Sequence, residues 1–437
     1  MRKFEKPLSI DPLLGSGFRS TPLHRGLSVG GARLFDRISE LVIIVSVLSI
    51  WELRLALIYD SELGHVSGQS AQPYFGNLTL GDFAIVAVYL WLWTLAEFRN
   101  FMRRLMRTWT GFAGGGLTFT VLILSPLSTE QDIFYNIKQA VQFAVNVAVV
   151  VPVFAFLVAV SSDVSRLFLR ISLLYVVVIL GGVVLYFFAG RQDVFRSSGD
   201  LRLYPNVAFD ALQYCVLAYA GIQFLTPSSF GQRAFGLIST ATFVLAAVLA
   251  ASRTMFVAMV AVAVSLVFFG AYLRFRSFVF YCLASATGIF GLYNYMFVGL
   301  ADLSFVMVRA DGFSDFERTR LITDALGRVS ESVPALLFGL GWDKSGVHNL
   351  VVQTFVDAGA IVAAFILLFI FTPLLVFWRF RRVAPSTCRL GAGVLVGFIF
   401  FYSLNALPTL RVYWIPLGIV VGLAMRARMA VSGPVRP

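Results

Sequence analysis

Long apolar runs separated by short polar breaks dominate the chain. A membrane-spanning helix needs about 20 mostly apolar residues, and twelve runs reach or approach that length. The predicted spans are 41–59, 81–98, 109–128, 139–161, 171–190, 207–225, 237–252, 254–273, 278–301, 357–378, 390–409 and 413–428. Run 237–252 is short, and only Ser252-Arg253-Thr254 separates it from the next run, which predicts a tight helical hairpin.

The composition agrees with this pattern. Of 437 residues, 58% are hydrophobic and 13% are charged, whereas about a quarter are charged in a soluble domain. A single soluble core stops growing near ~250–300 residues, and a multidomain soluble chain would need many more solvated charges. Intrinsic disorder is excluded by the apolar excess, and three cysteines without CxxC spacing exclude a disulfide scaffold. The predicted fold class is an all-α polytopic membrane protein with about 12 transmembrane helices.

Positive charge orients the predicted spans. With the N-terminus in the cytoplasm, lysines and arginines on the inner side outnumber those outside by about two to one. Both termini are therefore expected to be cytoplasmic, and the N-terminal segment is not expected to be a cleavable signal. The positive-inside pattern accounts for most of the net charge of +12, so no nucleic-acid partner is expected. The arginine-bearing breaks 99–108 and 162–170 are predicted to be inner loops.

The predicted organisation follows directly. Its parts are a basic cytoplasmic tail (1–40), transmembrane helices 1–9 (41–301), a long outer loop (302–349), transmembrane helices 10–12 (350–428) and a cytoplasmic tail (429–437). Within the outer loop, Ser314 with Glu317 three residues later has the spacing of a capping box. Apolar positions from Phe316 to Val329 recur at helical spacing, so this loop is expected to contain an amphipathic helix at the membrane–water boundary.

Arginines that the topology places outside form the first candidate site. A guanidinium binds phosphate through paired charge-assisted hydrogen bonds, so a lipid-linked phosphate or diphosphate is the expected ligand. Arg196 and Arg202 precede Pro205-Asn206, where Asn206 is a candidate helix cap. Asp210 follows one turn into the next span, where a carboxylate requires a partner. For each arginine alone, a solvated loop charge is an equally good interpretation.

Two later arginines are better candidates. Arg253 is flanked by apolar runs, so it must either reach water from the hairpin or bind an anion. Arg318 shares a helical face with Ile322, Ala325 and Val329, whereas Arg320 has Asp324 at i+4 and fits a surface ion pair. We therefore select Arg318 and discount Arg320.

A glycine-rich segment precedes the tenth predicted span. Gly339-Leu340-Gly341 permits close backbone approach, and His348-Asn349 follows it. Because imidazole titrates near neutral pH, His348 can accept a proton from a hydroxyl group. On spacing alone, a boundary histidine beside an Asn349 helix cap is the simpler interpretation.

Taken in order, these segments resemble the O-antigen ligase and polysaccharide polymerase family of bacterial inner membranes. The resemblance covers roughly residues 190–365 and the twelve-span topology. Its motifs are Arg196-x-x-Gly199…Pro205-Asn206, Ser252-Arg253, and Arg318…Ala325-Leu326…Pro334…Gly339-Leu340-Gly341…His348-Asn349…Asp357-Ala358-Gly359. Asp357 stands where the family commonly has glutamate, and Arg196 and Arg202 both fit the first arginine position.

The resemblance implies metal-independent, inverting glycosyl transfer on the periplasmic face of the inner membrane. The implied donor is an oligosaccharide on undecaprenyl diphosphate, and the acceptor is a glycan hydroxyl, on either a lipid-linked repeat unit or a lipid A–core. His348 is the implied base, without a metal or cofactor, and Arg196, Arg202, Arg253 and Arg318 bind the diphosphate. Asn206, Asp210, Asn349 and Asp357 have acceptor-binding or supporting roles. Membrane lipids surround the protein. A surface polysaccharide polymerase is favoured slightly over an O-antigen ligase.

Two other functions remain open. Asp60 and Glu62, with His65 nearby, have carboxylates that can hold a divalent cation, as in a metal-dependent transferase that uses a lipid monophosphate sugar. A transporter or lipid flippase would use intramembrane charges such as Asp210 and the Glu52/Arg54 pair, but no internal repeat supports this function.

The assignment predicts the outcome of single substitutions in a transfer assay. Replacing Arg253, Arg318 or His348 by alanine should abolish glycan transfer, because each removes a charge or a base that acts on the reacting groups. Membrane insertion, measured by fractionation, should be unchanged. Arg320→Ala should have a much smaller effect, and an equal loss for Arg318→Ala and Arg320→Ala would contradict the assignment.

Overall fold

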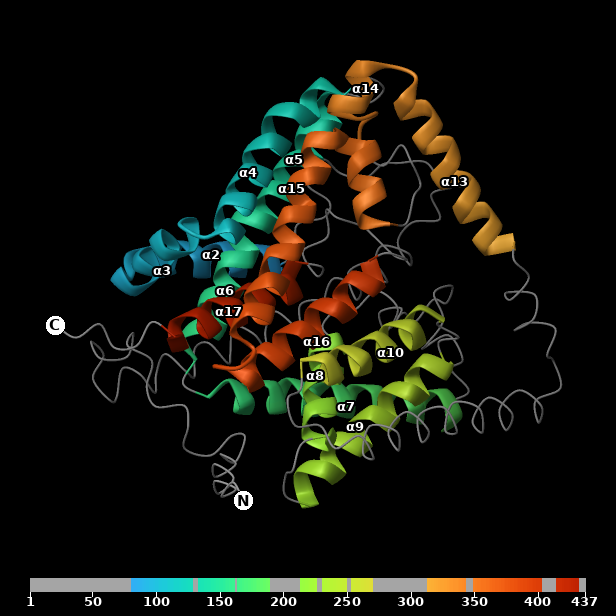
Figure 1. Cartoon of the computed structure of the whole chain (residues 1–437). Helices are drawn as coiled ribbons and strands as arrows, with labels where there is room; N and C mark the ends of the chain where they lie inside the picture. Colours follow the sequence, from blue (N-terminus) through green and yellow to red (C-terminus); the bar gives the residue numbers. More distant parts are fainter. Residues whose placement is uncertain are drawn as a thin grey trace, which may run out of the picture.

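The computed structural model describes residues 80–128, 133–161, 163–188, 213–225, 230–249, 253–269, 313–342, 349–402 and 414–431. Within these ranges every regular element is helical and there is no β-strand. The helices pack in an oblique arrangement, without a single common axis (Figure 1).

The helices of the first half are α2 (Leu80–Thr94), α3 (Ala96–Met106), α4 (Trp109–Leu124), η2 (Ser125–Leu127), α5 (Ile133–Val145), the π-helical segment η3 (Asn146–Val150), α6 (Val151–Val160), α7 (Val164–Phe188) and α8 (Gln213–Leu225). Those of the second half are α9 (Phe230–Leu249), α10 (Arg253–Phe268), α13 (Phe313–Ser330), α14 (Val333–Phe338), α15 (Leu350–Phe380), α16 (Pro385–Tyr402) and α17 (Trp414–Val431).

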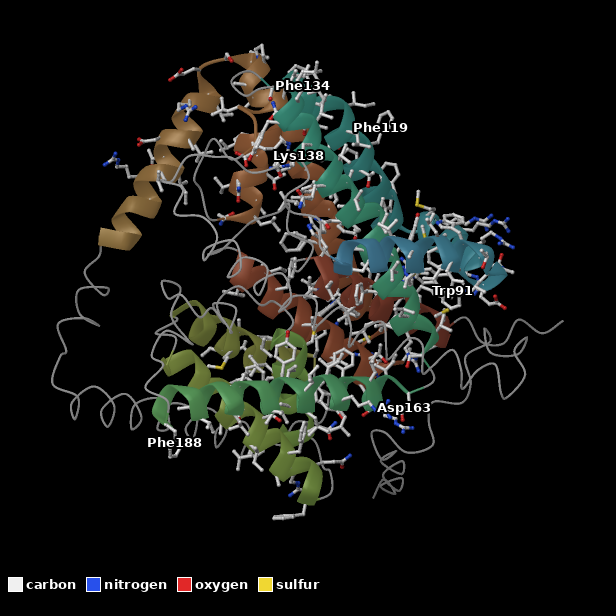
Figure 2. The ribbon with its side chains drawn as sticks, turned by 180° about the vertical axis from the view of Figure 1, so that it is seen from behind. Trp91, Phe119, Phe134, Lys138, Asp163 and Phe188 are labelled. Carbon is white, nitrogen blue, oxygen red and sulfur yellow. The ribbon has the colours of Figure 1, made fainter. Side chains whose placement is uncertain are left out.

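Four helical stretches in the described ranges are long and apolar enough to cross a membrane: Trp109–Leu127, Ile133–Val160, Val164–Val184 and Leu350–Phe380. Shorter apolar helices accompany them. Large aromatic side chains project from the outer surface of this group, among them Phe119 and Phe134, which are 66% and 78% exposed (Figure 2). Exposed apolar area of this kind requires an apolar surrounding, so the chain is a helical membrane protein.

Two groups of helices meet at α6 and α17. In one group α4 packs against α5 and α15; in the other α8 packs against α7, α9, α10 and α16. Helix α17 contacts α6, α15 and α16, and α6 is buried along its whole length. Figure 1 shows α4, α5 and α15 steeply inclined above the flatter α7.

Small residues allow several helix pairs to approach closely. A Cβ added at Gly418 of α17 would lie 2.8 Å from the Phe154 Cβ, and one added at Gly422 would lie 2.6 Å from the Ala155 carbonyl oxygen. A G-x-x-x-G spacing places both glycines on one face and lets two helix backbones approach in a membrane. The same device joins α4 to α15, where Gly116 receives the ring of Phe365.

The π-helical segment between α5 and α6 has a sequence cause. Pro152 lacks an amide hydrogen and its ring would clash with the carbonyl one turn earlier. The five-residue π segment Asn146–Val150 directly precedes it and accommodates that clash.

The structure corrects several predicted boundaries. Helix α7 begins at Val164 instead of 171, so Arg166 and Arg170 lie within its first two turns. Its start is set by Asp163, whose Oδ1 accepts a hydrogen bond from the Arg166 amide at 2.9 Å. The short span 237–252 is the 20-residue helix α9, and the span predicted from 357 begins at Leu350. Spans 41–59 and 278–301 lie outside the described residues.

The break predicted at 99–108 is largely helical, because arginines do not by themselves interrupt a helix. The structure has helix α3 there, with Phe98, Phe101 and Leu105 buried on one face. The chain leaves helical geometry at Leu95, and Arg99 Nη1 then donates to the Trp93 and Thr94 carbonyls at 2.7 and 3.0 Å. The arginine thus satisfies acceptors that the end of α2 leaves unpaired.

The α6–α17 contact predicts that one glycine-to-alanine substitution in a helix lowers stability instead of raising it. Glycine to alanine within a helix normally stabilises by roughly 0.5–1 kcal/mol, but Gly422→Ala should lower the melting temperature in detergent. The added Cβ must displace the Ala155 backbone, and overpacking of this kind costs about 1–3 kcal/mol.

Gly231→Ala on α9 is the matched control, because a Cβ added there would have nothing within 4 Å. Its melting temperature should stay constant or rise. A rise for Gly422→Ala as well would contradict the close approach of α6 and α17.

Candidate functional site

The candidate site centres on the contact between α14 and the first part of α15. Ser332 caps α14, and its hydroxyl accepts a hydrogen bond from the Ala335 amide at 3.2 Å. Pro334 lies in the first turn, where a missing amide hydrogen has no cost. The helix ends at Gly339, whose φ of 80° is left-handed. These local signals turn the chain back across α15.

Helix α15 is interrupted at Gly359, which has φ 88° and ψ 172°. Such a break deprives the preceding carbonyls of the amides one turn later in the helix. The Leu340 amide donates to the Val356 carbonyl at 2.7 Å, and the Gly341 amide donates to the Asp357 carbonyl at 3.1 Å. The glycine-rich segment therefore supplies hydrogen-bond donors at the break in α15.

Glycine is required on both sides of this contact. A Cβ on Gly339 would lie 2.4 Å from the Asp357 carbonyl oxygen, and one on Gly359 would lie 2.0 Å from the Leu337 carbonyl oxygen. Both positions also have positive φ, which side chains disfavour. The structure thus brings together two motifs selected from the sequence, Gly339-Leu340-Gly341 and Asp357-Ala358-Gly359.

Asn349 begins α15 as predicted. Its Oδ1 accepts hydrogen bonds from the Val351 and Val352 amides at 3.1 and 3.0 Å, so the helix-cap interpretation of this residue is confirmed. Asp357 lies two turns further along α15 and is fully buried. Because both residues lie before the break at Gly359, the helix rise of about 1.5 Å per residue fixes the separation between them.

Helix α13 packs beside this region, in contact with α14 and α15. Its buried residues Ala325 and Val329 form a small apolar cluster with Ala335, Leu340 and Val356, separate from the main core. The predicted amphipathic helix is thus confirmed, but it starts at Phe313. Ser314 is therefore inside the helix, and the predicted cap at that residue is wrong.

A third element, α5, anchors the far end of the glycine-rich segment. The Trp342 amide donates to Asn136 Oδ1 at 3.1 Å, and Asn136 Nδ2 in turn donates to Ser128 Oγ. The Trp342 ring is fully buried and lies 5.4 Å from the ring of Phe143. Two residues on one face of α5 therefore hold Trp342 by its backbone and its side chain.

Asn136, Gln139 and Trp342 are not among the site residues predicted from the sequence. Asn136 and Gln139 are buried amide side chains within the apolar stretch Ile133–Val160, and polar residues at such positions commonly mark partners or sites. Gln139 Oε1 and Trp342 Nε1 are buried, and neither has a hydrogen-bond partner among the described residues. The interruption of the apolar pattern is thus the signal that could have identified the two amides.

Only some of the remaining predicted site residues lie within the described ranges. Arg318 lies within α13, and Arg253 is the first residue of α10. Arg320 forms the expected surface ion pair, with Nε 3.6 Å from Asp324 Oδ2. Several candidates lie outside the described residues: Arg196, Arg202, Asn206, Asp210, His348, and the acidic group Asp60, Glu62 and His65.

Comparison with known proteins adds no assignment. No family model matches the chain, and no curated protein sequence matches it. Within the described ranges, no three His, Cys, Asp or Glu side chains are grouped closely enough to hold a metal ion. The site is thus characterised by its geometry: a polar backbone junction, closed by glycines and anchored by buried amides.

The junction predicts that Gly359 is indispensable for stability. Gly359→Ala combines a positive φ, which costs about 1–3 kcal/mol, with a Cβ that would overlap the Leu337 carbonyl. We expect a lower melting temperature and a reduced folded fraction by size-exclusion chromatography in detergent.

Gly327→Ala in the adjacent α13 provides the control, because a Cβ at this position would meet nothing within 4 Å. This variant should be at least as stable as the wild type. If both substitutions proved neutral, the tight contact between α14 and α15 would be excluded.

Proposed function

We propose that this chain is a membrane glycosyltransferase of the O-antigen ligase and polysaccharide polymerase type. It transfers a glycan from undecaprenyl diphosphate to a sugar hydroxyl on the periplasmic side of a bacterial inner membrane. A polymerase, which extends a surface polysaccharide, is the preferred form. The ordered arginine, glycine and histidine motifs of residues 190–365 support this proposal.

One structural observation supports it most strongly. Segment 343–348, which ends in His348, joins two anchored points. At one end, Trp342 is held by Asn136 and Phe143; at the other, Asn349 caps α15. A general base must be held near its substrate, and the described residues on both sides of segment 343–348 are held in this way.

The proposed chemistry assigns one role to each group. His348 accepts the proton of the acceptor hydroxyl while that oxygen bonds to the anomeric carbon. The bond between the anomeric carbon and the diphosphate oxygen breaks with inversion, and lipid diphosphate leaves. Arg196 or Arg202, with Arg253 and Arg318, stabilises the charge that develops on this leaving group. No metal or cofactor takes part in the proposed step.

The proposed topology has twelve spans, both termini in the cytoplasm and the loop 302–349 in the periplasm. The four long apolar stretches and the accompanying shorter apolar helices support a multi-pass arrangement. The amphipathic α13 suits a position at the membrane boundary, because one of its faces joins an apolar cluster whereas Arg320 and Asp324 are exposed on the other.

A transporter or lipid flippase is the second candidate. Transporter binding sites often use helices that are interrupted within the membrane, and α15 is interrupted at Gly359. In this chain the carbonyls at the break are paired with Leu340 and Gly341, which leaves them less available to coordinate an ion. We therefore prefer the transferase.

The decisive test is a polymerisation assay. Purified full-length protein in detergent and EDTA is given one lipid-diphosphate-linked repeat unit as the sole glycan, and the products are separated on a gel. A ladder of lengthening glycans is expected, because donor and acceptor are the same molecule and no divalent ion is needed. Arg320→Gln, which removes the exposed ion pair with Asp324, should retain the ladder.

Each other outcome identifies an alternative. Transfer only after addition of a lipid A–core acceptor would identify an O-antigen ligase. Activity that disappears in EDTA and returns with a divalent cation would favour the metal-dependent transferase. Absence of product under all these conditions, together with movement of the lipid-linked glycan across proteoliposome membranes, would favour the flippase.

A further inference from the structure

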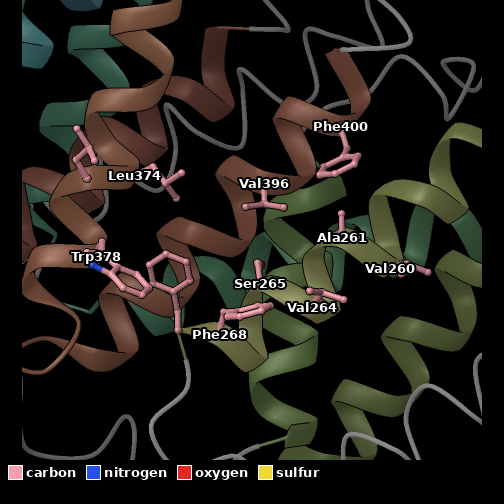
Figure 3. A pocket seen from close by; sticks show the side chains of 11 residues that line it. Val260, Ala261, Val264, Ser265, Phe268, Leu374, Trp378, Val396 and Phe400 are labelled. Carbon is pink, nitrogen blue, oxygen red and sulfur yellow. The ribbon is translucent and has the colours of Figure 1, made fainter.

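A large apolar groove lies among α10, α15 and α16, away from the α14–α15 junction. Its volume is about 960 Å³, at the upper end of the range for small-molecule pockets. Figure 3 shows how side chains of the three helices surround it. Its lining residues are Val260, Ala261, Val264, Ser265, Phe268, Phe269, Leu374, Leu375, Trp378, Val396 and Phe400.

The groove opens at the surface of these helices. Val260 and Leu375 on its rim are 62% and 67% exposed. Apart from the indole of Trp378, its only polar side chain is Ser265, which donates its hydroxyl hydrogen to the Val262 carbonyl within α10 at 2.7 Å. Most of the groove therefore has few hydrogen-bonding groups for a polar ligand, and it suits a hydrocarbon chain.

One end of the groove is different. The rings of Phe269 and Trp378 meet edge to face there, 5.9 Å apart. Arg389 of α16 reaches this end, and its Nε donates to the Phe269 carbonyl at 3.3 Å. The residue is only 6% exposed, and no described carboxylate forms an ion pair with it. A buried guanidinium without a counter-charge is costly, and an anion from outside the chain would relieve that cost.

A second arginine lies at the same end. The guanidinium carbon of Arg381 is 3.4 Å from the centre of the Trp378 ring, and Nη1 donates to the Trp378 carbonyl at 3.3 Å. Arg379 and Arg382 are exposed on either side of it along the chain. Positive charge thus gathers at one end of an otherwise uncharged groove.

We propose that this groove binds an anionic phospholipid, with an acyl chain along α10 and α16 and the phosphate near Arg389 and Arg381. The ligand and the site have the same polarity, apolar along the length and charged at one end. Guanidinium groups bind phosphate oxygens through charge-assisted hydrogen bonds, and basic pockets between membrane helices are known to take lipid head groups. An apolar helix of a partner would not neutralise the buried Arg389.

This lipid site is independent of the proposed transferase activity. The groove lies at the C-terminal ends of α10 and α15, whereas the α14–α15 junction involves the N-terminal part of α15. A protein without transferase activity would therefore still bind the lipid.

Native mass spectrometry of the full-length protein in detergent tests the proposal. Phosphatidylglycerol and phosphatidylcholine with identical acyl chains are titrated separately, and inorganic phosphate serves as a third probe. We expect phosphatidylglycerol to bind about tenfold more tightly than phosphatidylcholine. Both lipids have a phosphodiester, but the arginines at this end of the groove repel the choline cation of phosphatidylcholine. Phosphate alone should not bind detectably, because it cannot occupy the groove.

Single substitutions distinguish the contribution of the arginine charge to lipid binding from that of the apolar groove. Arg389→Gln should remove the preference for phosphatidylglycerol, and Arg389→Lys should keep part of it. Val264→Trp should weaken both lipids, because Val264 lines the groove and is 40% exposed, so the larger ring can fill it. Arg103→Gln is the control, since this exposed arginine of α3 lies on another helix and its Nη1 donates to Asn100, at 3.3 Å.

Several results would overturn the proposal. These are equal binding of the two lipids by the wild type, an equal loss for Arg103→Gln, or full lipid binding by Val264→Trp. A lipid-free dimer that Val264→Trp disrupts would assign the groove to a second copy of the chain. If Arg389→Gln does not fold, Arg381→Gln and Val264→Trp still decide the question.

Discussion

The need to pair backbone hydrogen-bonding groups away from water governs this structure. In an apolar environment each unpaired amide or carbonyl costs several kcal/mol, so a broken helix must find partners elsewhere in the chain. Helix α15 breaks at Gly359, and the amides of Leu340 and Gly341 pair with the carbonyls of Val356 and Asp357. The return of the chain after α14, the two glycines and the burial of Leu340 all serve this pairing.

The same requirement explains features far from the junction. Arg99 satisfies the carbonyls at the end of α2, and the π segment before Pro152 keeps α5 and α6 continuous. Between α17 and α6, the missing side chains of Gly418 and Gly422 let the two helix backbones come into contact. Packing in an apolar medium depends on such close approach, since burial of apolar surface from lipid contributes little.

The candidate site inherits its rigidity from these contacts. The Trp342 amide donates to Asn136 Oδ1 on a neighbouring helix. Asn349 Oδ1 accepts from the Val351 and Val352 amides at the start of its own helix. The buried Arg389 donates to the Phe269 carbonyl but has no carboxylate partner among the described residues. It lies beside a groove that suits a lipid chain. At the α14–α15 junction the backbone groups thus pair within the chain, whereas the buried Arg389 has a charge that an external anion would neutralise.

The sequence by itself determined the helical membrane character, the amphipathic helix α13, the Asn349 cap and the Arg320–Asp324 pair. These features depend on composition, helical periodicity or neighbours within four residues. Only the tertiary structure decided that Asn136 holds Trp342, that Gly339 faces Asp357, and that α3 is helical through its arginines. These contacts join residues as many as 206 positions apart, and no local pattern specifies which distant backbone will supply the missing hydrogen-bond partner.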